Sequence, residues 1–130
     1  MEGRKDDIKD NKLRWDLLPL DLIEKIVEVY HFGAQKYAPN TWKQLEDGEN
    51  RYRAALLRHL VEHEKGHLHD NESGLLHAQH LCWNAIALLY FAMEKEKSVL
   101  MEEVYDSPAL KAHSFRGGMK TQTDASRYII

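Results

Sequence analysis

The spacing of hydrophobic and polar positions along the chain predicts three helices. After Pro19, apolar residues recur at intervals of three and four, which is the spacing of one helix face. Asp21 and Glu24 form a capping-box pair at the start of this first helix, and the helix should end before Pro39, because proline forces the preceding residue into an extended conformation. Its apolar face is expected to consist of Ile23, Ile26, Val27, Tyr30 and Ala34.

The second helix is expected over roughly residues 52–65. Asn50 is a suitable N-cap for it, and Gly66 is a natural stop signal. Its inner face turns from apolar to polar toward the C-terminal end, where His59 and Glu62 lie. The pattern therefore predicts a helix whose first half packs into the core and whose second half carries polar side chains on the same face.

The third helix is expected to begin at Ser73, a good N-cap residue, and to run as far as Lys97. Residues 81–93 are apolar nearly all round, and a helix of that kind is buried on several sides. After Lys97 the period is lost, so the apolar residues before Pro108 either extend this helix or begin another short one. These residues are Val99, Leu100, Met101 and Val104.

The two ends of the chain differ from this helical middle. Residues 1–12 alternate acids and bases without an apolar anchor, so a flexible N-terminus is expected. The segment LRWDLLP stops at Pro19 and is expected to lie as an extended arm across the domain, covering part of its core. Residues 105–130 are expected to form a mobile tail; the alternatives are a tail that wraps a neighbouring subunit or one that contributes Arg116 or Lys120 to an anionic ligand.

Together these elements predict an all-α fold with one domain over residues 13–104. Three main helices make only a thin layer, and the apolar third helix needs a cover on the side that this layer leaves open. The expected fold is therefore a three-helix bundle completed by oligomerisation, as a homodimer or a dimer of dimers.

Composition narrows the class of protein without changing this fold. The 130 residues are 43% hydrophobic and 30% charged, which is ordinary for a soluble domain. A formal net charge of −3 gives no basic footprint, so polymeric nucleic acid is not an expected partner. The longest apolar run is too short to span a membrane, and the N-terminus has no signal-peptide pattern. The single cysteine, Cys82, lies in an apolar run, which predicts a small buried side chain in a reducing cytoplasm.

Polar chemistry is concentrated in residues 58–84, which hold six of the eight histidines and four carboxylates. A histidine is followed three residues later by a glutamate on the second helix and by another histidine on the third. Each pair therefore shares a helix face, and the loop between the helices adds further carboxylates. The candidate ligands and bases are His59, Glu62, Asp70, Glu72, His77 and His80.

Imidazole and carboxylate groups that converge on one point hold divalent metals. Histidine favours transition metals, and carboxylate favours Mg or Mn. Helical bundles supply metal ligands from facing helices at the same i, i+3 spacing. Buried polar groups without partners are costly, so an internal polar stripe needs a metal, water or a mutual hydrogen-bond network. The sequence leaves two interpretations open, a metal or catalytic site and an inert polar network.

The segment FGAQKYAPNTW lies where the first helix ends and combines a cation, an amide and two aromatic side chains. Lys36 could meet a phosphate as a point charge, and Tyr37 or Trp42 could stack on a base. Asn40 adds an amide to the same loop. The other interpretation is an ordinary loop held by two packed aromatic residues.

Four motifs occur along the chain in the order LRWDLLP, FGAQKYAPNTW, ALLRHL and DNESGLLHAQH. Through these motifs, residues 13–91 resemble a phage protein family named dATP/dGTP diphosphohydrolase, N-terminal domain. The family is similar in layout to small all-α, MazG-like nucleotide pyrophosphohydrolases. The chain departs from the family at Gly66 and His67, where Gly-Glu is common, and it lacks the MazG pattern of ExxE followed by ExxD. These departures leave the metal and the general base open. The resemblance implies a site of His59, Asp70, Glu72, His77 and His80, beside a ligand surface of Gly33, Lys36, Tyr37, Asn40, Trp42 and Arg58.

The function that the resemblance implies is hydrolysis of dATP or dGTP to the monophosphate and pyrophosphate. A divalent metal (Mg, Mn or another transition metal) would bridge the phosphates and activate water, and Glu62 or Glu72 would accept the water proton. The alternatives are a protein that sequesters a nucleotide or nucleotide-derived signal without turnover, and a metal-dependent phosphohydrolase of another nucleotide. The expected location is the cytoplasm, that of the host if a phage encodes the chain. The expected metal ligands are His59, Asp70, His77 and His80, and the expected substrate contacts are Lys36, Tyr37, Asn40, Trp42, Arg58 and Asn84.

Overall fold

The computed structural model describes residues 11–105, which form helices joined by short loops. The three α-helices are α1 (Leu20–Lys36), α2 (Gly48–Glu64) and α3 (His77–Tyr105). Two short 3-10 helices, η1 (Trp15–Leu17) and η2 (Thr41–Gln44), precede α1 and α2. No β-strand occurs within residues 11–105, and the all-α prediction is confirmed. The predictions for residues 1–10 and for the tail after residue 105 lie outside the described residues.

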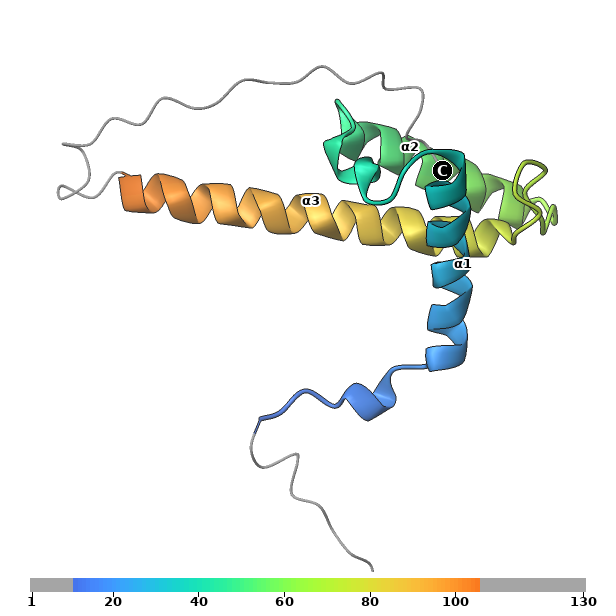
Figure 1. The fold of residues 1–130 in the computed structure, drawn as a ribbon, viewed down its shortest axis with the longest axis horizontal. Helices are drawn as coiled ribbons and strands as arrows, with labels where there is room; N and C mark the ends of the chain where they lie inside the picture. The colour runs from blue at the N-terminus through green and yellow to red at the C-terminus, as the bar shows by residue number, and fades with distance from the viewer. Residues whose placement is uncertain (1–10, 106–130) are drawn as a thin grey trace, which may run out of the picture.

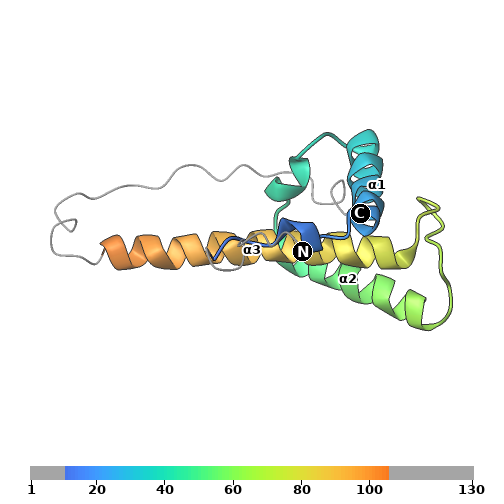
Figure 2. The same cartoon turned by 90° about the horizontal axis from the view of Figure 1, so that it is seen from below.

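α2 lies alongside α3, and α1 crosses α3 steeply (Figures 1 and 2). The contact between α2 and α3 is the most extensive in the fold, and α1 packs against α3. α3 is the longest helix, and its C-terminal half projects beyond its two neighbours (Figure 1). No helix in the described part of the chain is long and apolar enough to cross a membrane. The loop between α2 and α3 closes one end of this arrangement, and the predicted polar site lies at that end.

The core lies where the first half of α3 meets α1 and α2. Its buried residues are Val29, Leu45, Tyr52, Trp83 and Ala87. Aromatic rings surround them, and the Trp42 ring lies 5.2 Å from Tyr90 and 5.5 Å from Trp83 between ring centroids. Such edge-to-face pairs add about 0.5–1.5 kcal/mol beyond simple burial. We call this set of rings the aromatic cluster: Tyr30, Trp42, Tyr52, Trp83, Tyr90 and Phe91.

The observed helix starts differ from the prediction. Pro19 is the N-cap residue of α1 and no side chain caps the helix, so the capping box predicted at Asp21 is wrong. α2 follows an N-cap at Asp47, which places Asn50 inside the first turn instead of at the cap. At this start, a Cβ atom at Gly48 would lie only 2.8 Å from the ring of Phe91 on α3. Glycine therefore lets the first turn of α2 lie close to α3.

The predicted ends of the first two helices are confirmed. α1 ends at Lys36, before the proline that was expected to stop it. Directly after α2, Gly66 has a φ of 86°, in the left-handed region that favours glycine. The N–H of His67 donates to the carbonyl of Glu62 at 3.1 Å, which is the long hydrogen bond of a Schellman motif.

α3 begins at His77 and not at Ser73, because the chain first forms a tight turn closed by an isolated bridge between His69 and Leu76. At its other end the helix continues without a break to Tyr105. The apolar residues after position 97 therefore extend α3 and do not begin another helix.

Three predictions about burial are wrong. The LRWDLLP arm does not cover the core: it forms η1, and Trp15 is 74% exposed. Cys82 is exposed, because the buried face of α3 is the one that carries Trp83. On α1, Val29 is fully buried whereas Val27 is 54% exposed, since α1 presents only one narrow face to α3.

Candidate functional site

The loop between α2 and α3 folds back on itself and fixes the position of Asp70. The N–H of Asp70 donates to the carbonyl of Leu75 at 2.7 Å. Gly74, with a φ of 74°, donates its N–H back to the carbonyl of Asp70 at 2.8 Å. The carboxylate of Asp70 accepts hydrogen bonds from the N–H and the hydroxyl of Ser73, both at 2.9 Å. The local hydrogen bonds therefore fix the orientation of this carboxylate, as in an Asx turn.

Three of the predicted metal ligands come together. His59 on α2, Asp70 in the loop and His77 at the start of α3 each offer a ligand atom within 4.8 Å of the other two. The Nδ1 atoms of His59 and His77 lie 2.8 Å apart. Both histidines are buried, and Asp70 is half-buried. We call these three residues the His–Asp cluster.

His80, the fourth predicted ligand, lies beside the His–Asp cluster and stacks on His59, with ring centroids 4.6 Å apart. Its Nε2 lies 2.7 Å from the hydroxyl of Ser73 and 3.7 Å from the carboxylate of Asp70. The Ser73 hydroxyl donates its one proton to Asp70, so His80 donates from Nε2 and keeps a lone pair on Nδ1. That Nδ1 is buried and has no hydrogen-bond partner among the described residues.

The environment sets the protonation state of these groups. Burial, followed by the charge of His80, lowers the pKa of His59 to about 4. Burial also lowers the pKa of His80. For Asp70, burial alone would raise the pKa, but hydrogen bonds from Ser73 and the charges of the neighbouring histidines outweigh it and lower the pKa. At neutral pH, neutral imidazoles therefore surround an ionised carboxylate, the state in which such groups bind metals.

Both predicted bases already have side-chain partners. Glu62, on the same helix as His59, lies 2.8 Å from Nδ1 of His67, and this hydrogen bond lowers the pKa of Glu62. Glu72 is exposed and pairs with Lys36 at the C-terminal end of α1. A predicted base and the predicted phosphate contact therefore hold each other, and this pair ties the loop to α1.

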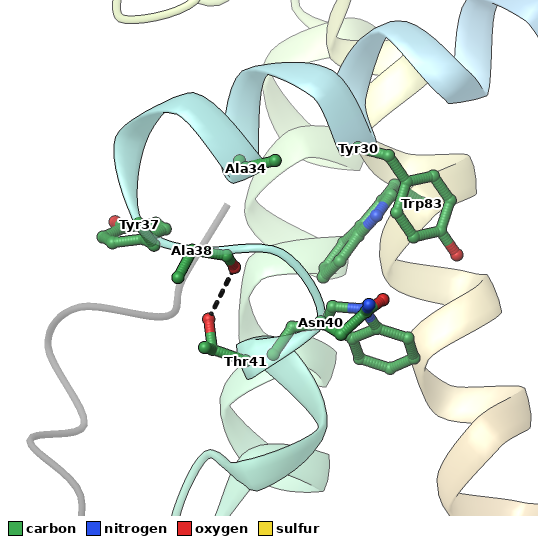
Figure 3. A pocket seen from close by; sticks show the side chains of 9 residues that line it. Tyr30, Ala34, Tyr37, Ala38, Asn40, Thr41 and Trp83 are labelled. Carbon is green, nitrogen blue, oxygen red and sulfur yellow. Dashed lines mark hydrogen bonds between the residues drawn. The ribbon is translucent and has the colours of Figure 1, made fainter.

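The predicted nucleotide loop encloses a cavity of only about 30 Å³ (Figure 3). Figure 3 shows Tyr30 and Trp83 on one side of this cavity and Tyr37 on the other. Trp42 also lines it, but its indole contacts four rings of the aromatic cluster edge to face. Asn40 is exposed, with a φ of 65°. A volume of this size holds about one water molecule, so this cavity has no room for a base, and the substrate role of the loop residues stays a prediction.

The two remaining predicted substrate contacts lie on different sides of the site. Arg58 is exposed on α2, and its positive charge contributes to the lowered pKa of His59. Asn84 is fully buried on α3, and its side-chain amide donates to the carbonyl of His80 at 2.8 Å. Arg58 is thus placed at the surface near the His–Asp cluster, while Asn84 supports the helical turn of His80. Their contacts with a substrate stay predictions.

Two supporting residues were missed in the sequence. Ser73 was expected to cap a helix but holds the loop carboxylate instead. Gln79 is buried between α1 and α3: its Oε1 accepts the N–H of Leu76 at 2.9 Å, and its Nε2 donates to the carbonyl of Lys25 at 2.7 Å and to Glu28 at 2.9 Å. Gln79 could have been found from its position three residues after Leu76, the residue before α3, which is the spacing of a capping box. The pattern was not recognised because a capping box has serine or threonine at the cap position and this chain has leucine.

The His–Asp cluster fits a divalent metal by its donor chemistry. Imidazole nitrogen and carboxylate oxygen form a common ligand set for zinc and other transition metals. The Nδ1 atoms of His59 and His77 lie at a hydrogen-bond distance of 2.8 Å, whereas two nitrogens bound at about 2.1 Å to one tetrahedral ion lie about 3.4 Å apart, so the two rings would separate slightly to admit an ion. Nε2 of His59 is also buried without a hydrogen-bond partner among the described residues, at a cost of about 1–3 kcal/mol, and a metal would remove this cost only if Nε2, and not Nδ1, were the ligand atom.

The fold and the site define an all-α domain with a candidate metal centre between two of its helices. Residues 2–99 match the family described as dATP/dGTP diphosphohydrolase, N-terminal, and the chain belongs to this family. A protein named dATP/dGTP diphosphohydrolase from Salmonella phage PMBT28 is 40% identical over 67 residues, which are 48% of this chain and 22% of that protein. The chain therefore spans only a minor part of the length of this relative. No solved structure matches the chain.

Proposed function

We propose that the chain carries out metal-dependent hydrolysis of dATP or dGTP to the monophosphate and pyrophosphate. The observation that carries this proposal is the convergence of His59, Asp70 and His77 within 4.8 Å in a member of the dATP/dGTP diphosphohydrolase family. The name of the phage relative supports the substrate class.

The residues of the chain prepare the site before substrate arrives. His59, Asp70 and His77 would hold a divalent metal with His80 alongside, and such a metal supplies positive charge for the phosphates and makes water more acidic. The lowered pKa of His59 keeps its imidazole neutral at neutral pH, so a metal does not have to compete with the second ring proton of an imidazolium. Ser73 fixes the carboxylate of Asp70 through two hydrogen bonds, as residues behind metal ligands commonly do.

Hydrolysis needs a base for the water proton. The water oxygen forms a bond to one of the two phosphorus atoms that the α–β bridging oxygen joins. The bond between that phosphorus and the bridging oxygen breaks. A carboxylate takes the proton that the water loses. Glu62 and Glu72 are the candidate bases. Separation of Glu72 from Lys36 would release a carboxylate for the proton and a cation for a phosphate at the same moment, which links substrate binding to activation of the base.

Incubation with the four deoxynucleoside triphosphates plus Mg, Mn or Co, with products separated by chromatography, tests the proposal. We expect monophosphate and pyrophosphate from the purine substrates, and no product in excess chelator. Glu62→Gln and Glu72→Gln identify the base, because loss of a general base lowers kcat by about 100-fold or more while leaving binding intact. Recovery of intact nucleotide from a tight complex would support the sequestering function instead.

The proposal includes a homo-oligomer. The face of α3 opposite the core exposes large apolar side chains along most of the helix. A second copy of the chain would cover this face and remove the apolar surface from water. The exposed residues on this face are Leu89, Met93, Leu100 and Val104.

A further inference from the structure

A groove of about 440 Å³ lies between α1 and the loop that carries Asp70. Sites for small ligands usually measure about 300–1,000 Å³, so the groove has the size of a nucleoside site. The cavity in the predicted nucleotide loop measures only about 30 Å³. The groove is therefore the better candidate of the two for the base and sugar of a nucleotide.

The walls of the groove combine apolar surface with hydrogen-bond acceptors. Val27, Phe32 and Leu75 supply the apolar part, and Glu24 and Glu28 supply carboxylates. None of the described residues that line the groove is a lysine or an arginine. A triphosphate would meet like charge here, whereas a purine base offers a flat apolar face and N–H donors at its edge.

The groove lies next to the His–Asp cluster, and the side chains of Ser73 and Phe32 separate the two. Ser73 lines the groove, and its hydroxyl contacts both Asp70 and His80. Phe32 also lines the groove, and its ring meets the His80 ring edge to face, with centroids 6.3 Å apart. A ligand in the groove would thus lie one side chain away from the candidate metal ligands.

Resting on the proposed function, we propose that this groove binds the nucleoside part of the purine nucleotide. The base packs against Val27, Phe32 and Leu75, and its N–H groups donate to Glu24, because the Glu28 carboxylate already accepts hydrogen bonds from Lys25 and Gln79. The phosphates point past Ser73 toward the His–Asp cluster. This arrangement separates the negatively charged end of the substrate from the carboxylates of the groove.

A change at Val27 tests the apolar wall, because this side chain is 54% exposed and a tryptophan there fills the groove without disturbing the core. Val99 on α3 is also 54% exposed and lies outside the groove, so Val99→Trp is the matched control. Titrations with Mn²⁺ present compare nonhydrolysable dATP and dGTP analogues, the free deoxynucleosides and tripolyphosphate. We expect Val27→Trp to weaken nucleoside and nucleotide binding at least about tenfold and to leave tripolyphosphate binding unchanged. Val99→Trp should change none of the three.

A charge reversal at Glu24 tests which end of the nucleotide lies in the groove. If the groove holds N–H donors of the base, Glu24→Lys weakens nucleotide binding; if it holds phosphates, the same change strengthens binding and overturns the proposal. Glu96→Lys, an exposed change on α3, corrects for the general effect of added positive charge. Circular dichroism confirms that the variants are folded.

The outcomes separate this inference from the proposed function. Nucleotide affinity that is equal in wild type and Val27→Trp, with purine hydrolysis intact, overturns the groove and leaves the proposed function standing. A wild-type protein that neither binds nor hydrolyses purine nucleotides overturns both. If wild type binds nucleotide without hydrolysing it and Val27→Trp abolishes this binding, the result supports the groove as the nucleoside site. It also overturns the proposed hydrolysis.

Discussion

At the scale of single residues, buried imidazoles determine how the domain responds to acid. The pKa of His59 lies at about 4 in the folded protein, while an unfolded histidine titrates near 6.5. Between these values the unfolded chain binds a proton that folded His59 does not bind. The free energy of unfolding should therefore fall as the pH decreases from about 6.5 to about 4, by up to about 3 kcal/mol from His59 alone.

Urea denaturation of the metal-free protein in the presence of chelator, at several pH values between about 4.5 and 7.5, checks this dependence. His59→Gln should flatten the slope, and His69→Gln, an exposed change in the loop, should preserve it. A wild-type stability that is flat across this range would show that His59 is not held in a neutral, buried state.

His59 and His77 could be selected from the sequence because helical spacing and residue type are local signals, whereas Asp70 was selected as a loop carboxylate and through the family resemblance. His59 and His77 lie near the facing ends of two helices whose existence the hydrophobic pattern predicts. The role of Ser73 could not be predicted, because it depends on a turn that delays the start of α3. The exposure of Cys82 could not be predicted either, since an all-round apolar helix does not reveal which face packs within its own chain.

At the scale of elements, Gln79 holds the N-terminal end of α3 against α1. Its three hydrogen bonds connect the backbone in front of α3 with the backbone and a carboxylate of α1. Gln79→Leu should reduce stability by about 1–3 kcal/mol, because buried hydrogen-bonding groups lose their partner. It should also weaken metal binding, since the same helical turn carries His77 and His80.

Urea denaturation and a metal titration on the same protein sample check both effects. Gln35→Leu is the control, because Gln35 is exposed on α1 and should change stability by less than about 0.5 kcal/mol. Unchanged stability and unchanged metal affinity in Gln79→Leu would show that the hydrogen bonds of Gln79 do not position α3.

Helix ends and helix starts differed in how well the sequence predicted them. The stop after α2 depends on Gly66 and its immediate neighbours, so a local pattern was sufficient. The first turn of α2 lies close to Phe91, more than forty residues away from Gly48, and only the packed structure reveals this approach. Residue spacing along the chain does not predict contacts between segments that are distant in the sequence.

At the scale of the whole molecule, α3 has apolar surface on two opposite faces. One face packs against α1 and α2, and the other exposes Leu89, Met93 and Leu100. A second copy should cover the exposed face, so light scattering should give a multiple of the 15.2 kDa chain mass. Leu100→Glu should shift this mass toward 15.2 kDa, because a buried carboxylate at an apolar interface is costly.

Leu68→Glu is the matched control, because Leu68 is an exposed leucine in the loop and lies away from the C-terminal half of α3. It should leave the mass unchanged. A wild-type mass of 15.2 kDa at micromolar concentration would contradict the oligomer and leave the exposed face of α3 without the proposed cover.

The central claim is that His59, Asp70 and His77 hold a divalent metal, and metal binding by wild type and His77→Ala tests it most directly. Protein is purified without chelator, its metal content is measured, and the stripped protein is titrated with Zn²⁺, Mn²⁺ and Co²⁺. His69→Ala serves as the control for an exposed loop histidine. We expect about one tightly bound metal per wild-type chain, and an affinity at least about 100-fold lower in His77→Ala, because one of three ligands is lost. Equal and negligible metal binding by wild type and His77→Ala would contradict the account.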